Sequence, residues 1–439
     1  MCFNLLKGTT MKKILMMTMI AITSAVIAGA KAECTVEVNH KNAIYKCGEK
    51  AEFTISITGK DGNLATNGFA DITLDNYGKK VFLSKKVDLA KGNPFKVDGT
   101  LKTPGFLRAT ISGNGFKVCT FGVGFDPEEI RPGAPNPDDF DEFWANAVKK
   151  LDETVPEDVK MELIPEKSKG LCNCYRISFA SYGSRRVYGW LSMPKDKSRK
   201  YPVKLHVPGA GIGATSCPTP PNAILLIMNV HSYQQPETND KDRRALYDEQ
   251  DRIYAFPNGV KRYCQAGIHK SREDYFYYAS ILGINRAVNW LAKRPECDMT
   301  AFTYFGTSQG GGFGLYLCGL NKHITKACIF VPAITDLAGE LVDNRQSGWP
   351  RIIEAQAEEN REAAMKHIPY FDAANFARRV TIPVRFIVGF ADNTCSPSAV
   401  YAGYNVVPSK DKKIYHGIGM GHAVRASLSG PLYKWQMEK

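Results

Sequence analysis

The sequence predicts an α/β protein with a doubly wound, mostly parallel sheet, preceded by a small all-β domain of the immunoglobulin-like sandwich type. From about residue 155 onward, nearly continuous apolar runs alternate with helical stretches, which is typical of buried parallel strands joined by helices. Residues 33–125 instead hold short runs of alternating polar and apolar residues, with turn residues between them at intervals of roughly ten positions. This second pattern is typical of an antiparallel sandwich.

Residues 1–32 are a predicted signal peptide rather than part of the fold. Met11-Lys-Lys precedes the apolar run Ile14–Ala28, and Ala30-Lys31-Ala32 follows it. A basic start, an apolar stretch and small residues two apart are typical of a secretory leader, so we expect cleavage after Ala32. A membrane anchor is disfavoured because the run is too short to cross a bilayer comfortably. The sequence predicts a secreted protein, periplasmic or extracellular, with no membrane attachment in its mature form.

Charge and cysteine content argue against two kinds of partner. The net charge of +13 falls to +9 once a leader with four lysines and no acid is removed, and the sequence holds no long Lys/Arg run. We therefore expect no nucleic-acid partner. The cysteines outside the leader show no metal-ligand spacing, so no metal and no other cofactor is expected. Their odd number implies at least one free thiol, and a disulfide among Cys34, Cys47 and Cys119 is left open.

The N-terminal domain, residues 33–125, is expected to form strands where polar and apolar residues alternate. Turn signals such as Gly48 and Lys60-Asp-Gly62 separate these strands. The region shows no Ser, His and Asp set that would indicate chemistry, and we interpret it as a structural or glycan-positioning module. The predicted strands are 34–38, 51–57, 70–74 and 105–111.

A proline-rich linker, residues 126–137, separates the two domains, because a run such as Arg131-Pro-Gly-Ala-Pro-Asn-Pro cannot pair inside a sheet. Asp138 and Asp139 then begin a predicted amphipathic helix, where acidic residues suit the helix dipole. The catalytic domain is expected to span residues 138–439. Its predicted strands are 187–193, 201–207, 223–230, 300–305, 327–331 and 384–388, and its clearest predicted helices are 275–292 and 311–320.

The strongest chemical signal is Gly306-Thr-Ser308-Gln-Gly310, between an apolar strand and a helical stretch. In this context Gly-x-Ser-x-Gly predicts the nucleophile turn of the α/β-hydrolase fold, in which glycines allow a tight bend that exposes the serine hydroxyl. The helix that follows offers unpaired backbone N–H groups to a developing oxyanion. A glycine-rich turn without chemistry is the alternative. We predict that Ser308 is the nucleophile of a serine hydrolase.

A serine hydroxyl needs a base, and in this fold an acid and then a histidine follow the serine along the chain. His422 is the predicted base because it lies in a glycine-rich loop near the C-terminus. His416 ends a predicted strand, and we expect a structural role for it. His323 and His367 have no supporting pattern.

The acid is expected in the loop after a late strand. Asp392 follows the predicted strand 384–388 and is positioned to accept the imidazole N–H, which fixes the tautomer. Asp372 is the reserve candidate, although its surroundings resemble the start of a helix. A second oxyanion donor is expected from the loop after an early strand. Pro208-Gly209-Ala210-Gly211 has that place, so the backbone N–H groups of Ala210 and Gln309 are the predicted oxyanion pair.

From about Pro137 to the C-terminus the chain resembles the acetyl xylan esterase and cephalosporin-C deacetylase family, the seventh carbohydrate-esterase family. The resemblance rests on Asp138-Asp-Phe-Asp-Glu-Phe-Trp144, on Ser308-Gln-Gly-Gly, and on the segment Tyr370–Pro383 that leads to the Asp392 loop. It implies an α/β-hydrolase fold and metal-free removal of acetyl groups from sugars and short esters. By position it implies a triad and an oxyanion pair, namely Ser308, Asp392 and His422 with Ala210 and Gln309.

Four features depart from the family pattern. Residues 229–236 stand in place of an Arg-Gly-Gln stretch, and Pro208-Gly-Ala stands where His-Gly and an aromatic residue are expected. Ala423 follows His422 where an acid is expected, and compact family members lack the N-terminal module. The triad chemistry is unaffected by these differences. The acyl size, the sugar and the ring-like oligomer of the family do not carry over.

The sequence therefore predicts a secreted serine esterase that removes acetyl groups from carbohydrate esters such as acetylated xylan or xylo-oligosaccharides. One alternative is another acyl hydrolase of the same fold, such as a feruloyl or glucuronoyl esterase or a peptidase. A second is a non-catalytic glycan-binding protein that kept the scaffold, which the intact Ser308, Asp392 and His422 disfavour. The sequence leaves open whether the protein forms a homo-oligomer.

Overall fold

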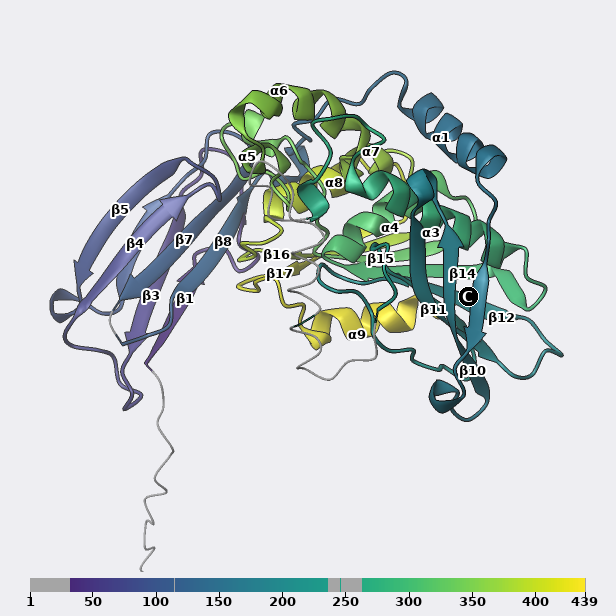
Figure 1. The fold of residues 1–439 in the computed structure, drawn as a ribbon. Coiled ribbons are helices and arrows are strands. Elements are labelled where there is room, and N and C mark those ends of the chain that lie inside the picture. The colour runs from purple at the N-terminus through teal and green to yellow at the C-terminus, as the bar shows by residue number, and fades with distance from the viewer. Residues whose placement is uncertain (1–31, 114, 236–244, 246–262, 439) are drawn as a thin grey trace, which may run out of the picture.

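The computed structural model describes residues 32–113, 115–235, 245 and 263–438. The predicted leader, apart from Ala32, lies outside these residues, and export therefore stays a prediction. Within the described ranges, none of the helices combines the length and the apolar character needed to cross a bilayer. Figure 1 shows a smaller all-β part at the N-terminus beside a larger α/β part.

A nine-stranded sheet forms the centre of the larger part within the described ranges (Figure 1). Its order is β17-β16-β15-β14-β12-β13-β11-β10-β9. The strands from β17 to β13 pair in parallel, whereas β11, β10 and β9 continue the sheet in antiparallel pairs. The prediction of an α/β fold with a mostly parallel sheet is confirmed. The strands are β9 (Lys160–Leu163), β10 (Cys172–Ala180), β11 (Arg186–Pro194), β12 (Tyr201–Val207), β13 (Ile224–Met228), β14 (Cys297–Thr307), β15 (Lys326–Phe330), β16 (Val384–Gly389) and β17 (Lys412–Gly417).

Helices cover both faces of this sheet. Figure 1 shows α9 on the side of the sheet opposite to α4. Leu432 of α9 packs into a small apolar cluster with Phe330 of β15 and Ile387 of β16. The helices are α1 (Phe140–Thr154), α3 (Phe276–Ala292), α4 (Gln309–Leu320), α5 (Ile352–Ala355), α6 (Glu358–His367), α7 (Ala373–Ala377), α8 (Pro397–Asn405) and α9 (Ala426–Trp435).

The N-terminal module consists of two sheets, with orders β1-β3-β6 and β2-β8-β7-β4-β5. Phe53 on one sheet and Phe121 on the other meet edge to face, with ring centroids 6.5 Å apart. All four predicted strands are present, and the immunoglobulin-like character of the module stays a prediction. The strands are β1 (Glu33–Val38), β2 (Ile44–Tyr45), β3 (Ala51–Thr58), β4 (Phe69–Asp75), β5 (Val81–Asp88), β6 (Phe95–Gly99), β7 (Gly105–Gly113) and β8 (Cys119–Phe125).

The cysteines of the module are not joined in a disulfide. Cys34, Cys47 and Cys119 are free thiols, and Cys34 and Cys119 lie close to each other. Burial raises the pKa of the Cys47 thiol to about 11, so this thiol is protonated near neutral pH.

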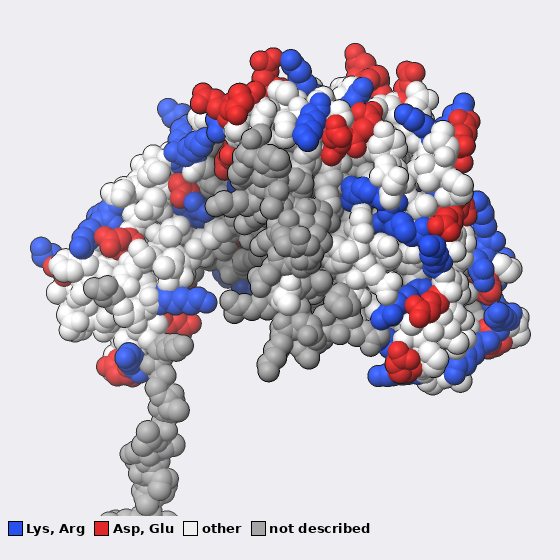
Figure 2. All heavy atoms as spheres, in the orientation of Figure 1, with Lys and Arg blue, Asp and Glu red and all other residues white. Residues whose placement is uncertain are grey.

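Charged side chains of both signs are spread over the face of the molecule shown in Figure 2, outside the grey atoms. Several opposite charges are paired, for example Lys96 with Glu52 at 2.7 Å and Arg379 with Asp141 at 2.7 Å. Mixed charges suit solubility better than attraction to a polyanion. The expectation that the protein binds no nucleic acid stays a prediction.

Candidate active site

Ser308 lies at the bend between β14 and α4 and has φ 60° and ψ −123°. A non-glycine residue at such angles is strained and persists only when its surroundings hold it. Here the backbone of Ser308 is held on both sides. Its N–H donates to Phe330 O at 3.0 Å, and its carbonyl oxygen accepts from Gly312 N at 3.1 Å and from Ala333 N at 2.9 Å.

The two glycines of the Gly-x-Ser-x-Gly motif are required by close packing. A Cβ atom at Gly306 would overlap the carbonyl oxygen of Gly310. A Cβ atom at Gly310 would in turn overlap the carbonyl oxygen of Val207, at the end of β12. Because α4 begins directly against the ends of two strands, only glycine fits at these positions. The motif thus places the Ser308 side chain at the C-terminal edge of the parallel strands.

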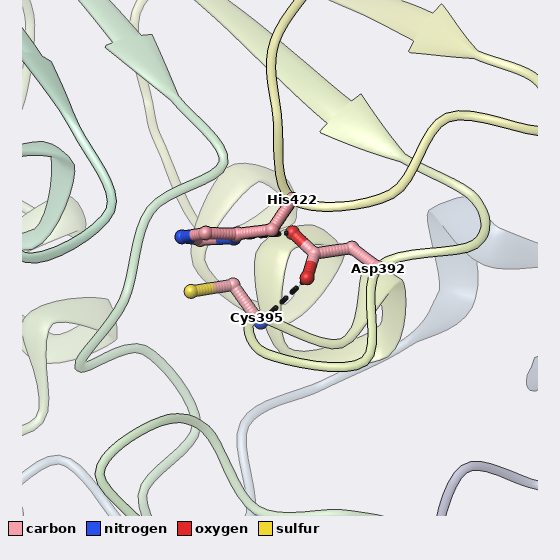
Figure 3. Close-up of side chains that lie close together, drawn as sticks. All are labelled: Asp392, Cys395 and His422. Atoms are coloured by element: carbon pink, nitrogen blue, oxygen red, sulfur yellow. Dashed lines mark hydrogen bonds and ion pairs between the residues drawn. The ribbon is translucent and has the colours of Figure 1, made fainter.

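Asp392 and His422 meet Ser308 from the loops after β16 and β17. His422 Nε2 lies 3.0 Å from Ser308 Oγ, and His422 Nδ1 lies 2.8 Å from Asp392 Oδ2. Figure 3 shows the Asp392 carboxylate aimed at the His422 ring. The carboxylate is fully buried, whereas the His422 side chain is 33% exposed. A carboxylate that accepts the Nδ1–H leaves the Nε2 lone pair directed at the serine hydroxyl.

The other candidates have different partners. His416 bonds through Nε2 with the Tyr401 hydroxyl at 2.7 Å, and His367 through Nδ1 with Ile268 O at 2.6 Å. His323 is exposed beyond α4. Asp372 caps α7 by accepting from Ala374 N at 2.9 Å. The structure therefore brings Ser308, His422 and Asp392 together, and the four other residues lie in structural or surface positions.

The predicted oxyanion loop lies beside the serine. A Cβ atom at Gly209 would be 3.9 Å from Ser308 Cβ, and the Gln309 side-chain amide donates to Gly209 O at 3.5 Å. Gln309 is itself held, because the hydroxyls of Tyr263 and Tyr277 donate to its Oε1 at 2.6 and 2.7 Å. In a trans peptide the N–H points away from the C=O. Fixing the Gly209 carbonyl therefore fixes the direction of the Ala210 N–H, and both donor roles stay predictions.

Comparison with known proteins identifies the family. A family model described as acetyl xylan esterase matches residues 127–438. The acetyl esterase Axe7A of Xylanibacter ruminicola is 30% identical over 384 residues, which cover 86% of this chain and 84% of that protein. The chain belongs to the acetyl xylan esterase family. It is therefore a carboxylic ester hydrolase, and the resemblance predicted from the sequence is confirmed.

Solved structures support the fold of the esterase. The acetyl xylan esterase from Paenibacillus sp. R4 has a TM-score of 0.60 and 22% identity, covering 71% of this chain and 98% of that one. Acetyl xylan esterase 1 from Thermoanaerobacterium sp. JW/SL YS485 has a TM-score of 0.58 and 20% identity, covering 71% of this chain and 96% of that one. Part of this esterase covers each of these two structures almost completely, so the remaining part of the chain has no counterpart in them. The Axe7A alignment covers a larger share of the chain than residues 127–438, so it includes part of the N-terminal module.

Residues 229–233 support the predicted oxyanion loop, and the sequence did not reveal this support. Asn229 Oδ1 accepts from Ala214 N at 2.6 Å, and His231 Nε2 donates to Gly211 O at 2.6 Å. The Tyr233 hydroxyl donates to Ile212 O at 3.3 Å. Three side chains from residues 229–233 thus bind backbone groups of residues 211–214. The polar character of these three residues and their place after β13 were the signals that the sequence offered. A sequence does not show, however, that their partners lie in another loop.

The stability of the esterase is expected to fall between neutral and mildly acidic pH through His231. Burial, assisted by the Arg185 charge, lowers the pKa of His231 to about 4, whereas an unfolded histidine has a pKa of about 6.5. Between these values the unfolded chain binds more protons, so stability is present above the unfolded pKa and is lost as the pH falls. The contribution between about pH 7.5 and about pH 5 is about 2 kcal/mol.

The measurement is urea unfolding at both pH values for the wild type and for His231→Gln, which keeps an N–H donor but does not titrate. The variant is expected to lose about 2 kcal/mol less than the wild type on acidification. Equal losses in the two proteins would show that His231 titrates alike in the folded and unfolded chains.

One group of potential metal ligands occurs among the described residues, and it shares Asp392 and His422 with the candidate triad. Ligand atoms of Asp392, Cys395 and His422 lie within 4.8 Å of one another (Figure 3). Asp392 and His422 are hydrogen-bonded to each other. Burial and the Asp392 charge raise the pKa of the Cys395 thiol well above its usual range. The hydrogen bonds of His422 with Asp392 and with Ser308 fit a serine mechanism, and a metal-free reaction stays the expectation.

Proposed function

We propose that the protein is an exported serine esterase that removes acetyl groups from xylan or its oligosaccharides, with Ser308, His422 and Asp392 as its triad. The observation that carries this proposal is the unbroken hydrogen-bonded series from Ser308 Oγ through His422 to Asp392, at 3.0 and 2.8 Å. The acetyl substrate is supported by membership of the acetyl xylan esterase family and by the name of the relative Axe7A. Export rests on the predicted leader.

The geometry supports a two-step reaction. Ser308 Oγ attacks the acetyl carbonyl carbon while its proton passes to His422 Nε2, and Asp392 stabilises the resulting imidazolium. The negative charge on the former carbonyl oxygen faces the N–H groups of Gln309 and Ala210. The intermediate then expels the sugar oxygen, which takes the proton from His422, and leaves an acetyl group on Ser308. Water, deprotonated by His422, attacks this acyl-enzyme, and expulsion of Ser308 Oγ, which regains its proton, releases acetate.

The same catalytic residues would serve other acyl groups. A feruloyl or glucuronoyl esterase or a peptidase needs the same triad, and a glycan-binding protein would use the surface without it. The identities of the acyl group and of the sugar are therefore to be established by measuring which substrates the protein hydrolyses. We expect a carbohydrate partner and no nucleic acid, as in the sequence prediction.

The test is hydrolysis by the mature protein of 4-nitrophenyl acetate, 4-nitrophenyl butyrate, acetylated xylo-oligosaccharide and methyl ferulate, with Ser308→Ala as the blank. We expect release of acetate from the oligosaccharide and a kcat/KM for the acetate ester about tenfold or more above that for the butyrate, the size of effect that two extra methylenes have in a tight pocket. Activity only on ferulate would assign a sister esterase. Equal rates for the wild type and Ser308→Ala on every substrate would refute a serine esterase.

A further inference from the structure

The N-terminal module packs directly on the loop that carries Asp392. The buried Tyr77 hydroxyl donates to the carbonyl oxygen of Phe390, two residues before Asp392. Phe106 meets the Phe390 ring edge to face, with centroids 5.0 Å apart. A Cβ atom at Gly122 would overlap the Phe390 carbonyl oxygen. In Figure 1 the module, with β7 and β8, lies on the side of the catalytic part where β16 and β17 lie.

A partly buried ion pair contacts the other side of the same loop. Arg108 binds Asp75 through two parallel bonds of 2.9 Å, and its third nitrogen donates to Asn393 Oδ1 at 2.9 Å. The side chains of Arg108 and Asp75 are only 19% and 8% exposed. The guanidinium also lies over the Tyr77 ring, 4.8 Å from its centroid. A bidentate pair in a partly desolvated place is geometrically rigid, so the donor to Asn393 is fixed.

The contact extends to the loop that carries His422. Phe390 N donates to Gly417 O at 3.0 Å, and Ala391 N donates to Met420 O at 2.9 Å. A Cβ atom at Gly419 would lie 3.5 Å from the ring of Phe121, which belongs to β8 of the module. The acid loop and the histidine loop are therefore hydrogen-bonded to each other, and the module lies next to both.

We propose that Tyr77, Arg108 and Gly122 are positioning residues of the active site, so that the N-terminal module sets the alignment of Asp392 with His422. This inference rests on the proposed function. Phe390 and Asn393, which lie on either side of Asp392 in the chain, are both hydrogen-bonded to side chains of the module. A shift of the Phe390 carbonyl is transmitted to Asp392 through two residues of backbone. Misplacement by about 1 Å can cost about a hundredfold in rate.

The first test compares two glycine substitutions in the module. Gly122→Ala forces a methyl group against the Phe390 carbonyl, whereas Gly92→Ala places the same group where no atom lies within 4 Å, on an extended backbone of φ 163°. We expect Gly122→Ala to lower kcat on 4-nitrophenyl acetate about a hundredfold with KM within about twofold, and Gly92→Ala to match the wild type. Rates are expressed per active serine, counted by titration with a fluorophosphonate, so that unfolded molecules do not contribute.

A second pair keeps the inference testable if Gly122→Ala does not fold. Tyr77→Phe removes only the hydroxyl that binds Phe390 O, and Thr103→Val removes a hydrogen bond of 3.0 Å from the module to Asp343, which is not part of the acid loop. Tyr77→Phe is expected to lower kcat about tenfold per titrated site and to slow fluorophosphonate labelling in proportion, with Thr103→Val unchanged. Wild-type kcat per site in Tyr77→Phe would overturn the inference, as would a loss explained by fewer titratable sites. An inactive wild type would instead refute the proposed function.

Discussion

Replacement of His422 by alanine is expected to lower kcat on 4-nitrophenyl acetate about a million-fold. Ser308 Oγ is 3.0 Å from His422 Nε2, which is the base that the described structure offers to this hydroxyl. Without it the serine keeps its proton near neutral pH, and the water that attacks the acyl-enzyme has no base to deprotonate it. Both chemical steps lose the same group, so the loss is large. Steady-state hydrolysis and the rate of Ser308 labelling by a fluorophosphonate measure it.

His416→Ala is the matched control, because this histidine lies six residues earlier and was the nearest alternative. Its Nε2 bonds with the Tyr401 hydroxyl at 2.7 Å rather than with the serine. We expect a loss of about 1 kcal/mol in stability from this bond and a kcat per active site within about tenfold of the wild type. A loss of kcat in His416→Ala as large as that in His422→Ala would show that His422 has been wrongly assigned as the base.

The parallel strands and the candidate triad were predictable from the sequence because their signals are local. β13, β15 and β16 are nearly continuous apolar runs, as burial on both faces requires, whereas β12 alternates and β14 is apolar mainly in its second half. Ser308 was indicated by two glycines whose Cβ atoms would overlap backbone oxygens. Asp392 and His422 follow from chain order, since parallel strands end at one edge of the sheet and their exit loops meet there.

The antiparallel strands β9 and β10 were not predicted. Every residue of β9 is exposed, and β10 mixes buried and half-buried positions, so neither shows a clean apolar run. Their register depends on pairing with β11 rather than on their own composition. The support of the active site was missed for a related reason: Arg108 and Asn393 are 285 residues apart, and a single sequence carries no signal for such a pair.

Replacement of Asp392 by asparagine is expected to lower kcat about ten-thousand-fold while the fold is kept. Asp392 Oδ1 accepts from Thr394 N at 2.8 Å and from Cys395 N at 3.0 Å. An asparagine must keep its oxygen on these two donors, because its NH₂ group there would face two N–H groups. The NH₂ group is then directed at His422 Nδ1, which must accept rather than donate. The proton of the imidazole moves to Nε2, where it blocks transfer from Ser308.

Asp372→Asn is the control for this prediction, since Asp372 was the reserve candidate for the acid. Burial and the Asp336 carboxylate raise the pKa of Asp372 to about 7, and it accepts from the backbone of Asp336, Leu337 and Ala374 at 2.7–2.9 Å. An amide in its place loses one or two of these bonds, so we expect a stability loss of about 1–3 kcal/mol in urea unfolding. Its kcat per active serine is expected to match the wild type. Should Asp372→Asn lose activity per site and Asp392→Asn keep it, the acid of the triad would be Asp372.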